Sequence, residues 1–210
     1  TNSNNSNNNS PEEFALVDYI GDSGFNNIAK REKDGDRLIY SINPRKNIFL
    51  EENLPHFSTK IARLVENIKN SEGIVFIYSQ FINSGVVPIA LALEHAGYSK
   101  YGGSLLKKET RPNKGKYIII GSETASEGLD FRFIRSVHIL EPWFHLNKID
   151  QVVGRGIRNC SHIALPPDKR NVTIYYYCST NPKAKTNESL DISIYRDAEK
   201  KSRNMSDVEY

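Results

Sequence analysis

The sequence predicts an α/β fold with a mainly parallel sheet and helices on both faces. Short apolar runs of the strand type alternate along the chain with stretches that carry apolar residues at helical spacing, and this alternation is typical of strand–helix–strand units. The strand candidates are residues 74–78, 117–120, 137–140 and 172–177. The first of them is apolar throughout, as expected of a strand that is covered on both faces. The 210 residues suit one such domain with appendages.

The N-terminal quarter of the chain is expected to precede the main domain. Residues 1–10 are almost all Asn and Ser, and a segment with so little apolar surface cannot offset the entropy lost on ordering, so we expect a disordered linker. Residues 11–57 contain two short apolar stretches, at 14–17 and 38–40, that could pair or pack. Glycines and a proline interrupt any longer period. We expect residues 11–57 to form a lead-in segment.

The main domain is expected to span residues 58–185. Behind a suitable N-cap at Ser58, apolar residues recur at the helical positions Ile61, Leu64, Val65 and Ile68. A second helix is predicted over residues 84–96, ended by Gly97. Residues 186–210 predict a C-terminal helical extension, because apolar residues recur there at helical spacing before a charged end.

The composition is that of an ordinary globular domain, with 38% hydrophobic and 25% charged residues. A formal net charge of +3 permits contact with nucleic acid without arguing for it. No apolar run approaches the roughly 20 residues of a membrane span, and the polar start lacks the pattern of a secretory signal. Cys160 and Cys178 lack metal-type spacing and are too few for a disulfide framework. We therefore expect an intracellular protein that is neither secreted nor bound to a membrane.

The most informative run is Gln151-Val-Val-Gly-Arg155-Gly-Ile-Arg158. Arg155 and Arg158, held one helical turn apart, could place two planar guanidinium groups around one polyphosphate. Gly154 and Gly156 flank Arg155, although each mid-helix glycine costs about 1 kcal/mol relative to alanine. Gln151 lies one turn before Arg155 and could hydrogen-bond to phosphate or to an attacking water. The alternative is a solvated helix with surface arginines and an exposed glutamine.

A second polar segment, residues 121–130, follows the strand candidate at 117–120. Ligands of parallel sheets lie beyond the carboxyl ends of the strands, where a loop and helix start also expose backbone N–H groups. Ser122 and Thr124 could add hydroxyl donors for a sugar-phosphate backbone, or simply cap a helix. Asp130 could accept a hydrogen bond from a ribose hydroxyl or an arginine, or form a local turn.

Three segments in this order resemble motifs IV, V and VI of superfamily 2 helicases and translocases: residues 74–81, 121–130 and 151–158. More narrowly, His138-Ile-Leu-Glu141-Pro-Trp143, followed by Ser161-His162 and Leu165-Pro, resembles the poxvirus-type nucleoside triphosphatase I and early transcription factor ATPases of large DNA viruses. The resemblance covers about residues 55 to 200.

The resemblance implies a RecA-like helicase C-terminal domain. Arg155 and Arg158 would then be arginine fingers that reach the β- and γ-phosphates of ATP, with Gln151 beside them. Gly128 and Asp130 match the family residues that face the nucleotide. By the same resemblance, the polar residues that follow two of the strands would contact nucleic acid, namely Ser79, Gln80, Ser122 and Thr124.

An ATPase also needs a phosphate loop with a lysine and a carboxylate that holds Mg²⁺. Neither G-x-x-x-x-G-K-[ST] nor D-E-x-[HD] occurs in the sequence. We therefore expect half of a motor, inactive alone, whose ATP and Mg²⁺ are bound mainly by an N-terminal RecA-like lobe of the same polypeptide. The resemblance implies DNA or RNA and a viral RNA polymerase as partners, in the virion or the host cytoplasm. The alternative is a non-catalytic helicase-like interaction module in a transcription complex.

Two further groups of residues receive structural interpretations. Trp143 and Phe144 could stack on bases, but core packing is the default for aromatic residues that follow a strand. His138 and His162 are far apart in the sequence and have no metal-binding pattern around them, so we do not expect them to be metal ligands. A complete small α/β enzyme is not favoured, because no nucleophile, base and orienting residue occur together.

Overall fold

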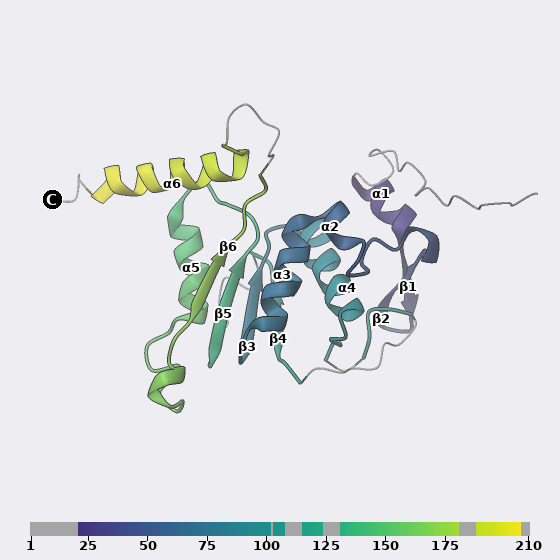
Figure 1. Cartoon of the computed structure of the whole chain (residues 1–210), viewed down its shortest axis with the longest axis horizontal. Coiled ribbons are helices and arrows are strands. Elements are labelled where there is room, and N and C mark those ends of the chain that lie inside the picture. The colour runs from purple at the N-terminus through teal and green to yellow at the C-terminus, as the bar shows by residue number, and fades with distance from the viewer. Residues whose placement is uncertain (1–20, 102, 108–114, 124–130, 181–187, 207–210) are drawn as a thin grey trace, which may run out of the picture.

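A four-stranded parallel sheet forms the centre of the computed structural model (Figure 1). In the spatial order β4-β3-β5-β6, the strands are β4 (Ile118–Gly121), β3 (Ile74–Tyr78), β5 (Ile134–Ile139) and β6 (Thr173–Tyr176). All neighbouring pairs run parallel, so the predicted sheet is confirmed. The structure describes residues 21–101, 103–107, 115–123, 131–180 and 188–206.

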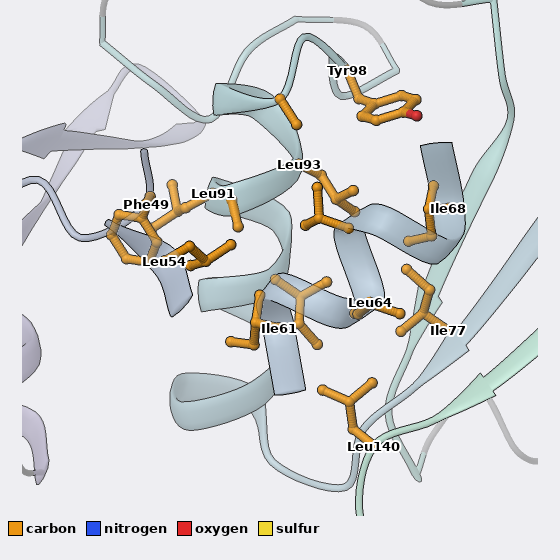
Figure 2. Packing of buried hydrophobic residues seen from close by; sticks show 14 of the residues in the cluster. Phe49, Leu54, Ile61, Leu64, Ile68, Ile77, Leu91, Leu93, Tyr98 and Leu140 are labelled. Carbon is orange, nitrogen blue, oxygen red and sulfur yellow. The ribbon is translucent and has the colours of Figure 1, made fainter. Parts of the chain in front are cut away.

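Helices cover both faces of the sheet because successive strand residues point to opposite sides. On one face, Val75 and Ile77 belong to a buried cluster with α3 (Thr59–Asn70) and α4 (Val87–His95) (Figure 2). On the other face, Phe76 and Tyr78 pack with α5 (Leu146–Gly156). The expected RecA-like arrangement is confirmed.

Helix α3 forms where the sequence predicts it. The hydroxyl of Ser58 accepts a hydrogen bond from the backbone N–H of Ile61 at 3.3 Å and caps the helix. The apolar stripe is buried at every predicted position: Ile61, Leu64, Val65 and Ile68. Each such side chain stabilises the fold by about 1.5–3 kcal/mol relative to an exposed one.

The helix predicted over residues 84–96 is present with a wider first turn. A π-helical segment, Ile82–Val86, precedes α4, and Pro88 lies in the first turn of α4, where its missing N–H is tolerated. Gly97 ends the helix as predicted, with a φ of +92°. The N–H of Tyr98 then donates to the carbonyl of Leu93 at 3.0 Å.

Residues 21–57 pack against the main domain. They form α1 (Gly21–Ile28), the antiparallel hairpin of β1 (Ala29–Asp34) and β2 (Arg37–Ile42), a 3₁₀ turn at Pro44–Lys46 and α2 (Leu54–Phe57). Tyr40 is buried with α3 and α4, and its N–H donates to the carbonyl of Leu105 at 2.6 Å. Buried Glu94 of α4 fixes that partner loop, because its carboxylate accepts the N–H groups of Leu105 and Leu106 at 2.7 and 2.9 Å.

The last helix, α6 (Leu190–Ser206), lies beyond the carboxyl ends of the strands (Figure 1). Tyr195 packs edge-to-face on Tyr176 of β6, with ring centroids 5.5 Å apart, and Ala198 is buried. The structure therefore has the C-terminal helix that the apolar spacing predicts. No helix in the described part of the chain combines the length and apolar character needed to cross a membrane.

Candidate functional site

Ser79 and Gln80 follow β3 at the carboxyl edge of the sheet. Ser79 is completely buried, and its hydroxyl donates to Oε1 of Glu141 at 3.0 Å. The backbone N–H of Gln80 donates to Oε2 of the same carboxylate at 3.2 Å. The Gln80 side chain is half-buried. A nucleic acid could therefore meet Gln80 directly, whereas it could reach the hydroxyl of Ser79 only if Glu141 released it.

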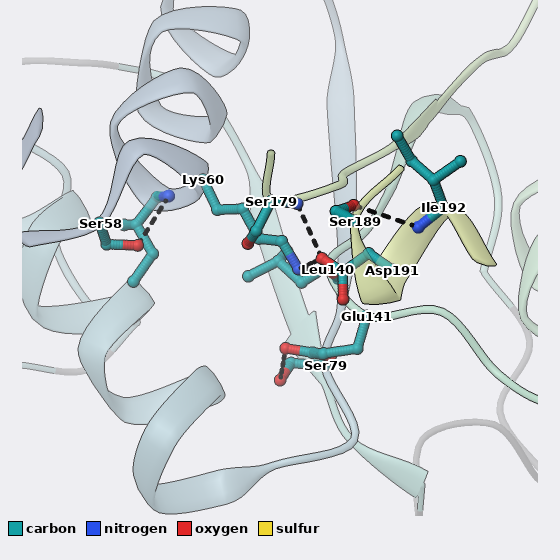
Figure 3. Close-up of polar contacts among 10 residues, drawn as sticks. Ser58, Lys60, Ser79, Leu140, Glu141, Ser179, Ser189, Asp191 and Ile192 are labelled. Atoms are coloured by element: carbon teal, nitrogen blue, oxygen red, sulfur yellow. Dashed lines mark hydrogen bonds and ion pairs between the residues drawn. The ribbon is translucent and has the colours of Figure 1, made fainter. Parts of the chain in front are cut away.

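Glu141, the second residue after β5, thus joins two loops at the carboxyl edge (Figure 3). Burial raises the pKa of its carboxyl, and the hydrogen bonds from Ser79 and Gln80 oppose that shift. Glu141 belongs to a segment that resembles the viral ATPases, but its sequence context predicted no role for it. The position of this acidic residue just beyond a buried strand was the sequence feature that could have indicated a role at the carboxyl edge.

A second polar contact ties α6 to the same edge. Nζ of Lys60 donates to the carbonyl of Leu140 at 2.9 Å and forms an ion pair with Asp191 at 2.7 Å. Asp191 also accepts the N–H of Ser179 at 2.7 Å (Figure 3). Although partial burial acts to raise the pKa of Asp191, these hydrogen bonds lower it overall. We call Lys60, Asp191 and Ser179 the α6 latch.

Ser122 lies beside the loop after β3. It follows β4 directly and is half-buried, and the N–H of Ser79 donates to the carbonyl of Gly121 at 3.1 Å. The structure thus brings three of the four predicted nucleic-acid residues to one edge. Thr124, together with the predicted nucleotide-facing residues Gly128 and Asp130, lies outside the described residues.

Helix α5 leads from the carboxyl edge back along the sheet. Near its start, Lys148 forms an ion pair with Glu123 beyond β4, while Gly156 at its end packs against Ile134, the first residue of β5. Gln151 and Arg155 lie one turn apart on this helix, as predicted. The position of Arg158 differs from the prediction of a second arginine on the same helix. Helix α5 ends at Gly156, and Arg158 lies in the following loop.

The glycines beside Arg155 have different environments. A Cβ at Gly156 would lie 2.4 Å from Cγ2 of Val137, so close packing on β5 requires glycine there. A Cβ at Gly154 would meet nothing within 4 Å. Packing on the sheet therefore explains the glycine at 156 but not the one at 154.

The described site residues are therefore spread along the sheet, with Gln151 and Arg155 on α5. Ser79, Gln80 and Ser122 meet at the carboxyl edge of the sheet. Half-exposed Arg158 lines an open groove of about 460 Å³ with His162 and Val172, the residue before β6, at the amino edge. Such a separation suits two ligands better than one.

The aromatic residues after β5 also differ from each other. Trp143 is half-buried, packs with the α5 side of the core and has Nζ of Lys148 4.9 Å from its ring centroid, so its predicted packing role is confirmed. Phe144 is 58% exposed, and the same prediction is wrong for it because its ring points out of the core.

His138 is a buried structural residue. Its Nδ1 lies 2.8 Å from the hydroxyl of Tyr177 and its Nε2 lies 3.1 Å from that of Ser136. Burial lowers the pKa of His138 to about 4 and raises that of Tyr177 to about 12. In the parts of the chain that the structure describes, no group of three or more His, Cys, Asp or Glu side chains could hold a metal ion.

Comparison with known proteins identifies viral relatives. A protein of Acanthamoeba polyphaga mimivirus, whose name describes an ATP-dependent RNA helicase, is 34% identical over 64% of this chain and 32% of its own length. A protein of Invertebrate iridescent virus 3, named as a helicase, is 31% identical over 92% of this chain and 23% of its own length. The chain is homologous to helicases of large DNA viruses.

The termination factor NPH-I homologue of African swine fever virus is also similar, with 31% identity over 63% of this chain and 27% of its own length. No family model matches the chain. The matched region thus spans about a quarter to a third of these viral relatives.

Proposed function

We propose that this chain is the second RecA-like motor lobe of an ATP-dependent superfamily 2 helicase or translocase that acts on nucleic acid in viral transcription. The observation that carries the proposal is the placement of Gln151 and Arg155 on α5, with Arg158 beyond it, away from the edge that holds Gln80 and Ser122. Relatives named as an ATP-dependent RNA helicase and as a termination factor homologue support this assignment.

ATP fits the chemistry of the α5 residues. Arg155 and Arg158 are half-exposed, and the space beside Gly154 is open. When bound, ATP supplies the phosphoanhydride bond whose hydrolysis drives the motor. The two guanidinium groups place positive charge at the phosphoryl oxygens, and Gln151 offers a hydrogen bond beside them. We assign Mg²⁺ mainly to the first lobe, because neither the phosphate-loop motif nor D-E-x-[HD] occurs in this sequence.

Nucleic acid is assigned to the carboxyl edge. Gln80 and Ser122 offer neutral hydrogen-bonding groups, which suit contacts with the sugar-phosphate backbone. Buried Ser79 positions this loop through Glu141. Thr124 remains a proposed backbone contact, and Gly128 with Asp130 a proposed nucleotide contact. The partners that complete this proposal are DNA or RNA, the first motor lobe and the viral RNA polymerase.

Steady-state ATP hydrolysis by a polypeptide that carries both lobes tests the proposal. Arg155→Ala and Arg158→Ala should each lower turnover by about two to five orders of magnitude, as expected for loss of a transition-state arginine. The affinity for ATP should change little, because the first lobe supplies most of the ground-state contacts. Near-normal turnover in both variants, with parental melting temperatures, would instead favour the non-catalytic interaction module.

A further inference from the structure

The position of Arg158 is not fixed by helix α5. The helix ends at Gly156, and Ile157 leaves helical geometry with φ −115° and ψ 81°. The backbone that carries Arg158 is therefore the start of a loop that reaches Arg170 before β6 begins. Residues of that loop hydrogen-bond to the backbone of Arg158, and a group that acts on a ligand with constant geometry depends on such support.

His162 anchors the loop to the central sheet. Its side chain is buried, and Nε2 lies 2.6 Å from the carbonyl oxygen of Ile134, the first residue of β5. Because a carbonyl oxygen only accepts, Nε2 must carry a proton, and in the neutral ring Nδ1 then accepts from the hydroxyl of Ser161 at 2.8 Å. The N–H of Ser161 donates to the carbonyl of Arg158 at 3.1 Å. A continuous chain of hydrogen bonds thus links β5 to Arg158.

Arg170 closes the loop from its other end. Its Nε donates to the carbonyl of Leu165 at 2.8 Å and its Nη2 donates to that of Ile163 at 3.0 Å. Arg170 also lines the same groove as Arg158. Both of these hydrogen bonds lie within the loop, so the guanidinium group of Arg170 ties one part of the loop to another.

We propose that His162 and Arg170 are positioning residues that hold Arg158 in the geometry needed for phosphoryl transfer. This inference rests on the proposed function, because it assumes that Arg158 acts on ATP. A reacting group misplaced by about 1 Å can lose about a hundredfold in rate. Loss of either anchor should therefore affect the rate of the chemical step without removing any charge that contacts the phosphates.

The test uses the two-lobed polypeptide and measures kcat and KM for ATP. Arg170→Ala and His162→Ala should each lower kcat about ten- to hundredfold and leave KM nearly unchanged. His162→Gln should recover much of the loss, since its amide N–H can replace the donor to Ile134. Arg63→Ala is the matched control, because it removes an equal charge from α3, where Arg63 pairs with Glu66 and not with the loop.

A double substitution separates positioning from direct contact. With Arg158→Ala already present, adding Arg170→Ala should cause no further loss of kcat. A further loss would show that Arg170 acts on the nucleotide itself, which would overturn the positioning role. If His162→Ala fails to fold, Arg170→Ala still tests the proposal, because the Arg170 side chain is exposed and does not belong to the core.

The possible failures are distinct. If Arg158→Ala lowers turnover but neither anchor variant does, this inference fails and the proposed function stands. If Arg158→Ala leaves turnover unchanged, the proposed function fails and the inference falls with it.

Discussion

Gly154 and Gly156 occupy equivalent places beside Arg155 in the sequence, yet the sheet constrains only one of them. Gly156 lies against β5, where a methyl group would overlap Val137, whereas Gly154 is exposed and faces open space. No contact in the described chain explains why α5 carries a glycine at 154, which is unfavourable in a helix. A close approach by a second lobe on that side would explain it.

Alanine substitutions should separate these two roles. Gly156→Ala should lower the free energy of unfolding by about 1–3 kcal/mol, the usual range for an overpacked core. Gly154→Ala should instead raise it by up to about 1 kcal/mol in the isolated chain, because alanine favours the helix. Urea unfolding of both variants measures the difference, and equal destabilisation would contradict the distinction.

His138 should make folding sensitive to mild acid. Its folded pKa of about 4 lies below the usual value near 6.5, so the unfolded chain binds the proton more readily. Stability contributed by neutral His138 is therefore present above pH 6.5 and is lost as the pH falls toward 4, by about 1.4 kcal/mol per pH unit. Unfolding measured across this range should show a shallower slope for His138→Gln. His56→Gln, at an exposed position, provides the control for the loss of a histidine side chain.

Among the elements, those specified by local pattern were predictable. The cap at Ser58 and the apolar stripe behind it identified α3, and the unbroken apolar run at 74–78 identified β3. The end of α5 before Arg158 was not predictable, because the sheet contact that constrains Gly156 is not visible in the sequence. The hairpin of β1 and β2 was also missed, since its main anchor, Tyr40, bonds to a loop more than sixty residues later.

The candidate site, like the helices and strands, was predictable only where a local sequence pattern specified it. Motif spacing placed Gln80 and Ser122 at strand ends, and the parallel sheet then brings those ends together. The link between Ser79 and Glu141 joins residues 62 positions apart, and the sequence offered no pairing signal for it. The roles of His162 and Arg170 likewise depend on the folded path of the loop after α5.

Helix α6 should depend on the latch between Lys60 and Asp191. Both side chains are only 18% exposed, and charge-assisted hydrogen bonds of this kind contribute about 1.5–3 kcal/mol. Asp191→Ala should therefore speed amide hydrogen exchange in α6 about tenfold or more. Glu199→Ala is the control on the same helix, because its exposed ion pair with Arg203 should contribute little. Similar exchange rates in both variants would argue against the latch.

At the scale of the whole molecule, the two edges of the sheet should act on different ligands. Gln80 and Ser122 lie at the carboxyl edge, while Arg158 lies near the amino edge. The isolated chain should bind nucleic acid weakly, because one lobe provides few contacts, and its net charge of +3 should make that binding weaker as the salt concentration rises. It should not hydrolyse ATP at a measurable rate, since the groups assigned to nucleotide and metal binding lie largely on the first lobe.

Oligonucleotide binding by variants of the isolated chain tests whether the two edges of the sheet act on different ligands. Gln80→Ala and Ser122→Ala should each weaken binding to a mixed-sequence oligonucleotide severalfold, because each removes a hydrogen bond at the carboxyl edge. Arg158→Ala should weaken it no more than Arg135→Ala, which measures the general effect of losing one positive charge. Fluorescence anisotropy at two salt concentrations provides the affinities. If Arg158→Ala were as damaging as Gln80→Ala, the nucleic acid would have to reach both edges of the sheet, and the groove beside Arg158 could not be reserved for the nucleotide.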